Sequence, residues 1–459
     1  MADIKISIIG AGSAIFSIRL VGDLCRTKEF HGSHVTLMDI DRERLDAVYN
    51  LATRYAKALG SKLHFEKTDD LERAIEGSDF VINTALVGGH AEQAIMREVG
   101  ERNGYYRGID ATEFNFVSDY FTLTNTRQFD YFLEIARKME KVVPKAELLL
   151  AANPVFEGTN LISRMSGIKV TGFCHGHHDV RLVAEAVGVE LEDVDWQVAG
   201  FNHNIWLTRF RKGKENLYGR LDRWIEREIE NWQAKDPFDL QLSPGAIDMY
   251  KFYGRMPIGD SVRNGSWKYN YDPATKRRWF GHPWGGVDTK EGWQWYQERL
   301  RESTERTFKL AGDESADLLK EFPPEEMSGE QHVQYIDALV NNKKTRLVLN
   351  IPNYDNSRKE RIIPDFPENV YVEVPVTVDG NGVLPEVIDP QIPEKIVKMY
   401  LFPRWLRMEW ALDAYISGDI SVFKEILVRD RRTDSEAQIE RLVVELAEAN
   451  PAFAKRYGL

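Results

Sequence analysis

A glycine-rich turn directly after the first apolar segment restricts the possible folds of this chain more than any other feature. The apolar run Ile4–Ile9 predicts a buried strand, the run GAGS follows at residues 10–13, and Phe16–Cys25 has the pattern of a helix. A strand, a glycine turn and a helix in this order leave backbone N–H groups and a helix N-terminus free to receive a pyrophosphate. The third glycine of the usual GxGxxG pattern is absent, because residue 15 is Ile.

Asp39 is a second sign of a dinucleotide site in the same region. It closes the second predicted strand, in the run VTLMDID, about 20 or more residues beyond the glycine turn. An acidic side chain at that strand end can bond both ribose hydroxyls, which favours NAD over NADP. The alternative is a Rossmann-like fold without a nucleotide. We predict that NAD binds at Gly10, Gly12, Ser13, Ala14, Phe16 and Asp39.

Apolar runs in the first part of the chain predict a parallel sheet. Charged segments of helix length separate these runs, an alternation that is typical of a doubly wound sheet. A further strand-like run, Ile168–Cys174, leads into a candidate helix from Asp179. The first four runs are Ile4–Ile9, Val35–Met38, Phe80–Leu86 and Glu147–Ala152.

The composition changes beyond about Glu215. Segments rich in Trp, Tyr and Arg, with Pro and Gly between them, predict a mostly helical second region. The run DGNG at residues 379–382 predicts a hairpin, and Pro393–Leu446 predicts amphipathic helices. We expect an α/β protein whose residues 1–195 form a Rossmann-like doubly wound parallel sheet that binds NAD. Residues 196–459 would form a mostly helical α+β domain for substrate binding, metal binding and oligomerisation.

Charge and composition limit the partners of the chain. It carries 72 acidic and 60 basic residues, a net charge of −12 and a pI near 5.5, which disfavours nucleic acid as a partner. No apolar run approaches the roughly 18 residues of a membrane span, and the start, MADIKISIIGAG, does not have the pattern of a signal peptide. Cys25 and Cys174 are the only cysteines, which fits a reducing compartment. We expect a cytoplasmic protein with no membrane partner.

Cysteine and histidine gather at the end of one predicted strand, in the run CHGHH at residues 174–178. Open α/β sheets place their active sites at the carboxyl ends of strands, so this run is a candidate metal site. A buried thiol and a solvated helix entrance are the alternatives. The spacing of a closed zinc site is absent. A thiolate and an imidazole with open positions suit a borderline divalent ion that a substrate completes.

Two further segments place polar residues in unusual surroundings. Asn202-His203-Asn204 interrupts the extended, apolar-rich run Trp196–Phe210, where each polar side chain costs free energy unless it is hydrogen-bonded. Asp260 lies on the loop MPIGDSVR close to Arg263. A carboxylate there can act as a general base or form a surface ion pair.

Motifs along the whole chain resemble those of glycoside hydrolase family four. In order they read GAGSAIFS, TLMDID, NTALVGGH, GYYRGID, VSDY, AANPVFEG, FCHGHH, WQVAGFNHNIW, MPIGDSVRNGSW, SGEQH, LNIPN and VEVP. Cys174, the run AGFNH and the region from SGEQH to LNIPN are specific to that family, whereas the glycine turn is generic. The most similar branch is that of the α-glucosidases, which carry a Cys-His-Gly motif.

The resemblance implies a glycosidase that uses NAD and Mn²⁺ or another divalent transition metal, an exception to hydrolysis by two carboxylates. In that mechanism NAD⁺ removes a hydride from carbon 3 of the sugar, and the resulting ketone acidifies the proton on carbon 2. A base removes this proton, the metal stabilises the enediolate, and the glycosidic oxygen leaves. Water then adds, and NADH returns the hydride.

The family's site residues can be placed on this sequence one by one. Cys174, as a thiolate, and His203 match the metal ligands. Asp260 matches the base of the α-glucosidases, although other branches use Tyr for the same proton. Asn153, in the run AANP, matches a residue that contacts the sugar and the nicotinamide. The resemblance also implies a homodimer or homotetramer.

The run CHGH bears on the general acid and on the substrate. Members that act on 6-phosphosugars have Cys-Asn or Cys-Asp followed by a proline, whereas His175 follows the cysteine here. The general acid is therefore open between His175 and Asp119 of VSDY, and unphosphorylated α-glycosides are favoured. We expect an α-glucosidase, because LVGGHAEQ resembles that branch. An α-glucuronidase or α-galacturonidase, with Arg263 receiving the carboxylate, is the alternative.

Two other classes of protein share some of these features. An NAD-dependent sugar or hydroxyacid dehydrogenase would share the Rossmann half but would accumulate NADH with its product. Cys174 together with AGFNH argues against it. A catalytically idle sugar-binding protein would release no aglycone, and the set of Cys174, His203 and Asp260 argues against that class.

Overall fold

The computed structural model describes residues 3–13, 15–105, 124–264, 273–430 and 432–459. Among the predicted site residues, Ala14 and Asp119 lie outside these ranges. In the described parts of the chain, no helix combines the length and the apolar character that a membrane crossing requires.

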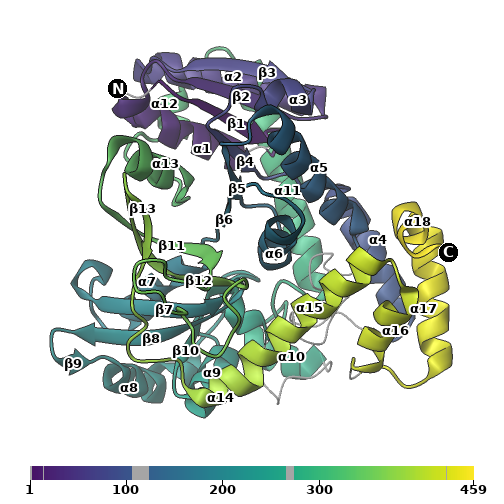
Figure 1. Ribbon diagram of the computed structural model, residues 1–459. Helices are drawn as coiled ribbons and strands as arrows, with labels where there is room; N and C mark the ends of the chain where they lie inside the picture. Colours follow the sequence, from purple (N-terminus) through teal and green to yellow (C-terminus); the bar gives the residue numbers. More distant parts are fainter. Residues whose placement is uncertain (1–2, 14, 106–123, 265–272, 431) are drawn as a thin grey trace.

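Thirteen strands of the described residues form one mixed sheet (Figure 1). The order is β10-β8-β7-β12-β11-β6-β5-β4-β1-β2-β3, with β13 paired to β12 and β9 paired to β8. The strands are β1 (Lys5–Ile9), β2 (His34–Met38), β3 (His64–Thr68), β4 (Phe80–Asn83), β5 (Glu147–Leu150), β6 (Val170–Gly172), β7 (Asp195–Phe201), β8 (Asn204–Lys212), β9 (Glu215–Asn216), β10 (Met256–Ile258), β11 (Thr345–Pro352), β12 (Tyr371–Asp379) and β13 (Gly382–Pro385).

One half of the sheet is parallel and runs β3-β2-β1-β4-β5-β6, the strand order of a dinucleotide-binding fold. The predicted α/β class with a Rossmann-like N-terminal sheet is confirmed, and the four predicted apolar runs form β1, β2, β4 and β5. β3 is a strand that no apolar run predicts. Its sequence, HFEKT, contains no apolar run, because this edge strand is buried only at its last residue.

The other half of the sheet is antiparallel and comes from residues beyond β6. β11 and β12 lie between β6 and the β7–β8 hairpin (Figure 1). β6 pairs with β11 at Gly172 and Asn350, and β12 pairs with β7 at Glu373 and Gly200. The hairpin predicted at residues 379–382 connects β12 and β13. The sheet runs across residue 195, and the division into domains at that residue stays a prediction.

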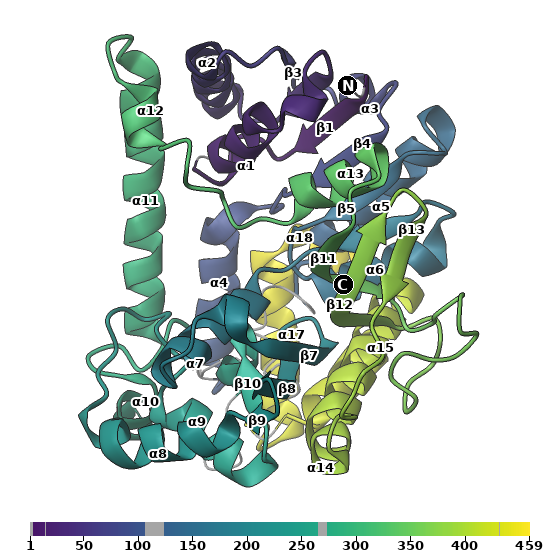
Figure 2. The same ribbon diagram turned by 90° about the vertical axis from the view of Figure 1, so that its left-hand side faces the viewer.

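Helices connect the strands and cover the sheet. Long α11 runs along one side of the molecule and packs against α2 (Figure 2), and α17 packs against α4. The helices are α1 (Ile15–Arg26), α2 (Arg42–Leu59), α3 (Leu71–Ile75), α4 (Gly89–Arg102), α5 (Thr126–Val142), α6 (Val155–Met165), α7 (Val180–Ala186), α8 (Tyr218–Glu228), α9 (Pro244–Tyr253), α10 (Pro273–Phe280), α11 (Lys290–Gly312), α12 (Leu318–Glu321), α13 (His332–Asn341), α14 (Glu394–Ile396), α15 (Phe402–Ser417), α16 (Ile420–Val428), α17 (Glu436–Ala449) and α18 (Pro451–Tyr457).

Helix α2 shows why such segments are helical. Its first turn is capped by Asp41, whose side chain accepts a hydrogen bond from the Arg44 N–H at 3.1 Å. Its end is set by Gly60, which has a φ of 66°. Between these ends, Leu45 and Val48 belong to a buried apolar face with helical spacing.

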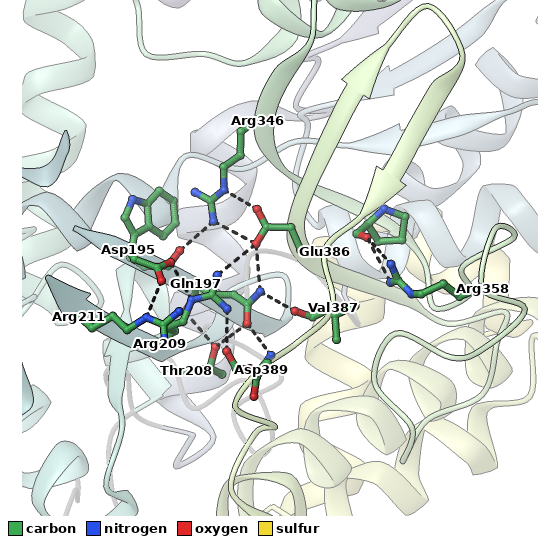
Figure 3. Close-up of polar contacts among 12 residues, drawn as sticks. Asp195, Gln197, Thr208, Arg209, Arg211, Arg346, Arg358, Glu386, Val387 and Asp389 are labelled. Carbon is green, nitrogen blue, oxygen red and sulfur yellow. Dashed lines mark hydrogen bonds and ion pairs between the residues drawn. The ribbon is translucent and has the colours of Figure 1, made fainter. Parts of the chain in front are cut away.

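A polar cluster ties the β7–β8 hairpin to the segment that follows β13 (Figure 3). Gln197 Nε2 donates to Glu386 Oε2 at 3.0 Å and to the Val387 carbonyl at 2.9 Å. Gln197 Oε1 accepts from the Asp389 N–H at 2.9 Å, and Arg346 Nε donates to Glu386 Oε1 at 2.6 Å. Because Gln197 is fully buried, these bonds satisfy an amide that would otherwise be costly to bury.

Candidate active site

Cys174, His203 and Asp260 converge although they lie on three separate segments. Each offers one ligand atom, and the three atoms lie within 4.8 Å of one another. Cys174 follows β6, His203 lies between β7 and β8, and Asp260 lies in the short 3₁₀ helix η5, Gly259–Asn264. The structure therefore brings together three of the residues that the sequence singles out, while their chemical roles stay predictions.

His203 reaches this cluster from a tight turn. Phe201 pairs with Asn204, so Asn202 and His203 form the turn of the β7–β8 hairpin. His203 has a φ of 59°, a left-handed conformation that costs of order 1–3 kcal/mol for a residue other than glycine. Residues held in this way cluster at functional sites. Asn202 Nδ2 donates to Glu373 Oε2 at 3.0 Å and so holds the turn against β12.

Asp260 reaches the cysteine loop because two glycines touch. Gly259 has a φ of 62°, and a Cβ there would lie 2.6 Å from the Cα of Gly176. A side chain on residue 259 would therefore push η5 away from the loop that follows β6. On the other side of η5, Ser261 Oγ accepts from the Ile205 N–H at 2.7 Å and fixes η5 against β8.

The two oxygens of Asp260 have different neighbours. Oδ1 accepts from Arg263 Nη1 at 2.8 Å, and Oδ2 lies 3.3 Å from His203 Nε2. Burial opposes ionisation of this carboxyl, but the charges of His203 and Arg263 prevail and hold its pKa well below the usual range. Asp260 is therefore a carboxylate at neutral pH.

A buried chain of ion pairs holds Arg263. Its Nε and Nη2 donate to the two oxygens of Asp288 at 2.7 and 2.5 Å. Asp288 Oδ1 also lies 3.4 Å from Arg97 Nη2, and the Arg97 guanidinium lies 4.4 Å above the ring of Trp293. Arg263 is only 4 % exposed, and its Nε, Nη1 and Nη2 all contact the two aspartates. Arg263 is therefore already bound by two carboxylates, and its contact with a uronate carboxylate stays a prediction.

The donor set of the cluster fits a divalent transition metal. Sulfur, nitrogen and oxygen ligands bind such ions at roughly 2.0–2.3 Å, so ligand atoms around one ion lie about 3–4 Å apart. The ligand atoms of Cys174 and His203 lie within 4.8 Å of each other, and Asp260 Oδ2 lies 3.3 Å from His203 Nε2. Burial and the charges of Glu373 and Asp260 raise the pKa of the Cys174 thiol well above its usual range. A cation beside Cys174 is what would favour its thiolate form.

His175 is an exposed residue beside the cluster. Its Nδ1 lies 3.4 Å from Glu330 Oε1, and the hydrogen bond to Glu330 raises the pKa of His175 to about 9. The imidazole therefore carries a proton at neutral pH. Asp179 is the last residue of the 3₁₀ turn η2, Gly176–Asp179, which follows His175. Burial together with the charge of Asp260 raises the pKa of Asp179 to about 6.

The glycine turn and Asp39 have the geometry of a dinucleotide cradle. The N–H groups of Gly10 and Ala11 both donate to the Met38 carbonyl at 2.9 Å, which draws the turn to the end of β2. The Gly12 N–H donates to Asp39 Oδ2 at 2.7 Å, and a Cβ at residue 12 would lie 2.7 Å from that oxygen. The chain is thus tightly folded around the space in front of α1, whose N-terminus suits a pyrophosphate.

The remaining predicted cofactor residues lie near the same strand ends. Ser13 is exposed in the glycine turn, and Phe16 belongs to the first turn of α1. Asn153 is half-buried between β5 and α6. These positions are compatible with the predicted NAD site, and contact with the cofactor stays a prediction.

Sequence models of two protein-family domains match this chain. The model described as family 4 glycosyl hydrolase matches residues 5–189, and that of the family 4 glycosyl hydrolase C-terminal domain matches residues 198–433. The chain belongs to glycosyl hydrolase family 4. The resemblance inferred from the motifs is confirmed, and membership of a hydrolase family over both segments argues against an ordinary dehydrogenase.

Named relatives of this family 4 member act on several sugars. An α-galacturonidase of Lachnoclostridium phytofermentans is 24% identical over 481 residues, covering 99% of this chain and 97% of the relative. An α-galactosidase of Bacillus subtilis is 30% identical over 255 residues, 54% of this chain and 56% of the relative. An α-glucosidase of Erwinia rhapontici is 23% identical over 303 residues, 63% of this chain and 59% of the relative.

Solved family 4 structures share the fold. A putative glucosidase of Bacillus subtilis superposes with a TM-score of 0.77 at 21% identity, covering 97% of this chain and 100% of that chain. A 6-phospho-α-glucosidase from gut microorganisms superposes with a TM-score of 0.75 at 18% identity, covering 98% and 99% of the two chains. That structure is a complex with NAD and Mn²⁺.

Glu373 is a site residue to which the sequence analysis assigned no role. It is fully buried beside the cluster of Cys174, His203 and Asp260. Its Oε2 accepts from Asn202 Nδ2 at 3.0 Å and from Asn350 Nδ2 at 3.2 Å. Burial raises the pKa of Glu373 to about 7. Glu373, Asn350 and Glu330 lie in the motifs VEVP, LNIPN and SGEQH, so the sequence contained the signal but not the contacts that explain it.

Proposed function

We propose that this chain is an NAD- and Mn²⁺-dependent α-glycosidase that works by oxidation, elimination, addition and reduction. The convergence of Cys174, His203 and Asp260 within 4.8 Å carries the proposal. A glycosidase of the common kind places two carboxyl groups on either side of the scissile bond. This cluster instead offers one carboxylate with a thiol and an imidazole, in a chain whose first half has the dinucleotide-binding strand order.

The chain has residues that would hold both NAD and the metal ion. The glycine turn, the start of α1 and Asp39 would hold NAD, which supplies reversible hydride acceptance. Cys174 and His203 would hold Mn²⁺ or another divalent transition metal, which supplies a Lewis acid where negative charge develops on a sugar oxygen.

The chain's own residues would move the protons. Asp260 is ionised and oriented by Arg263, so it accepts the proton from carbon 2 of the sugar. His175 is protonated at neutral pH and exposed, so it donates to the leaving glycosidic oxygen. Asp119, outside the described residues, is the competing general acid.

The substrate proposal begins with α-glucosides, because the motif LVGGHAEQ resembles that branch. Relatives named α-galacturonidase match 99%, 93% and 91% of this chain, whereas a relative named α-glucosidase matches 63%. This observation favours an α-galacturonide as a second candidate substrate. The cytoplasmic location and the homodimer or homotetramer belong to the same proposal.

A substrate panel separates these candidates. It contains the p-nitrophenyl α-glucoside, α-galactoside, α-galacturonide, α-glucuronide and 6-phospho-α-glucoside, each assayed with NAD⁺, Mn²⁺ and a thiol reductant. We expect release of p-nitrophenol from an unphosphorylated α-glycoside without net formation of NADH. Net formation of NADH in proportion to product would instead identify a dehydrogenase.

Deuterium incorporation tests the chemical route. If Asp260 removes the proton from carbon 2, hydrolysis in D₂O places deuterium at carbon 2 of the released sugar. Asp260→Asn should then lower the rate by roughly 10²–10⁴-fold while NAD and metal still bind. Product without deuterium, together with an Asp260→Asn enzyme of near wild-type rate, would overturn the mechanism.

A further inference from the structure

A row of glycine and polar residues crosses the sheet where its parallel and antiparallel halves meet. Gly172 of β6 pairs with Asn350 of β11, and Asn350 pairs with Glu373 of β12. Glu373 in turn pairs with Gly200 of β7. The row therefore spans four strands, with two polar side chains at its centre and a glycine at each end.

The two candidate metal ligands leave the sheet just beyond the ends of this row. Cys174 is the second residue after Gly172, and His203 is the third residue after Gly200. A Cβ on Gly172 would lie 2.8 Å from the Asn350 Cβ, so β6 and β11 approach closely at this point. The separation of the two ligands therefore depends on the strands that the row joins.

Glu373 gathers hydrogen bonds from both sides of the row. Its Oε2 accepts from Asn350 Nδ2 at 3.2 Å and from Asn202 Nδ2 at 3.0 Å. Asn202 directly precedes the left-handed His203, and all three bonded side chains are at most 2 % exposed. Glu373 Oε1 has no hydrogen-bond partner among the described residues, so the side chain is held through one oxygen alone.

We propose that Glu373 and Asn350 are positioning residues of the metal site. Their hydrogen bonds hold Asn202, and through it the His203 turn, so that the ligand atom of His203 stays within 4.8 Å of that of Cys174. Residues that orient metal ligands typically change metal affinity 10–100-fold when they are lost. This inference rests on the metal site of the proposed function.

Two substitutions at Glu373 separate hydrogen bonding from charge. Glu373→Gln keeps an oxygen that can accept from both asparagines, and its new NH₂ group takes the place of Oε1. Glu373→Leu keeps the volume and removes the acceptor. The probe is Co²⁺ bound to the full-length protein, measured by calorimetry and by the thiolate-to-cobalt absorption band. We expect affinity about 10–100-fold weaker for Glu373→Leu and within a few-fold of wild type for Glu373→Gln.

Gln197→Leu is the matched control. Gln197, in β7, resembles Glu373 because it is fully buried and joins two segments through side-chain hydrogen bonds. It differs because it bonds Glu386, Val387 and Asp389 and not the His203 turn (Figure 3). We expect Gln197→Leu to lower the melting temperature and to leave the cobalt affinity and the absorption band unchanged. Asn350→Leu removes one of the two donors to Glu373 and should weaken cobalt binding, as Glu373→Leu does. It replaces Glu373→Leu in the test if that variant does not fold.

The outcomes are distinguishable. Cobalt affinity at the wild-type level in Glu373→Leu or Asn350→Leu would overturn the positioning role, as would an equal loss in Glu373→Gln and Glu373→Leu. An equal loss in Gln197→Leu would overturn it too, because the effect would then follow from stability alone. If wild type and Cys174→Ser bind cobalt equally and neither shows the thiolate band, the metal site itself fails, and with it the proposed function.

Discussion

His332 shows how burial sets the charge of a single residue. It is fully buried, and its ring stacks on that of Phe173 with 4.2 Å between the ring centroids. Neither ring nitrogen has a hydrogen-bond partner among the described residues. Burial lowers the pKa of His332 to about 4, although the charge of Glu330 opposes the shift. The ring is therefore uncharged at neutral pH.

The pH dependence of folding follows from that pKa. The unfolded chain protonates His332 near pH 6.5 and the folded protein only near pH 4, so the unfolded state binds more protons between these values. The free energy of unfolding should fall as the pH drops from 6.5 to 4, by roughly 3 kcal/mol from this residue, and be independent of it above 6.5. His332→Phe keeps a stacked ring and removes the titration. Urea unfolding as a function of pH should give a flatter curve for this variant, and equal slopes would contradict the prediction.

Asp39 is the residue on which NAD binding is predicted to depend most. Its two oxygens accept from the N–H groups of Gly12 at 2.7 Å and Asp41 at 2.9 Å, and the side chain is only half-buried. Asp39→Ala removes the carboxylate that is predicted to accept hydrogen bonds from the ribose hydroxyls of NAD. Since a hydrogen bond to a charged group contributes about 1.5–3 kcal/mol, NAD binding should weaken roughly 10–100-fold while the fold stays intact. Calorimetric titration with NAD measures this. Asp41→Ala is the control, because it removes the cap of α2 and should reduce stability but not NAD affinity. Unchanged affinity in Asp39→Ala would refute the role.

Single residues were predictable where the local sequence is unusual. Cys174 could be singled out because it ends an apolar run, His203 because it interrupts one, and Asp260 because it lies on a glycine-containing loop beside a basic residue. The engagement of Arg263 could not, because its partner Asp288 lies 25 residues further along the chain and meets it only after folding. An arginine beside a carboxylate in sequence looks the same whether it is free for a substrate or bound to a third side chain.

At the scale of elements, the contact between η2 (Gly176–Asp179) and η5 decides whether the cluster forms. A Cβ on Gly259 would lie 2.6 Å from Gly176 Cα, so the two turns touch through backbone. Periodicity predicted most strands and helices because it reports which face is buried. It could not predict this contact, which depends on the absence of a side chain at Gly259. Nor could it predict edge strand β3, which has almost no buried face.

Gly259→Ala should therefore separate Asp260 from Cys174. Displacement of a catalytic group by about 1 Å can cost about 10²-fold in rate, so we expect at least that loss of kcat, with weaker metal binding. Gly254→Ala is the matched control: its φ of 74° is equally unfavourable for alanine, but nothing lies within 4 Å of the added Cβ. Both variants should lose stability, and only Gly259→Ala should lose activity. Equal activity in the two variants, measured on the best substrate of the panel, would contradict this role of the contact.

At the scale of the whole molecule, the site is assembled from both halves of one sheet. Cys174 leaves the last strand of the parallel half, and His203 and Asp260 come from the antiparallel half. The strand–helix alternation predicted most of the parallel half because β1, β2, β4 and β5 lie in continuous apolar runs. The insertion of β11 and β12 between β6 and β7 was not predictable. Residues 345–379 come more than a hundred positions after the β7–β8 hairpin in the sequence, but in the sheet they lie between that hairpin and β6.

A metal that binds across these two halves should stabilise the entire fold. An ion that binds the folded protein but not the unfolded chain adds a free energy that grows with the logarithm of its concentration, about 2.7 kcal/mol at 100 times the dissociation constant. The melting temperature of the wild-type protein should therefore rise steadily with added Mn²⁺ and fall back with a chelator. Cys174→Ser should lose this dependence, because a hydroxyl stays protonated where the thiolate would bind.

The stabilisation by NAD is the internal control, since the glycine turn and Asp39 do not contact Cys174 in any described hydrogen bond. It should persist in Cys174→Ser. A melting temperature that rises equally with Mn²⁺ in both proteins would place the ion elsewhere on the molecule, whereas loss of the response to both Mn²⁺ and NAD would show that the substitution disrupts the fold.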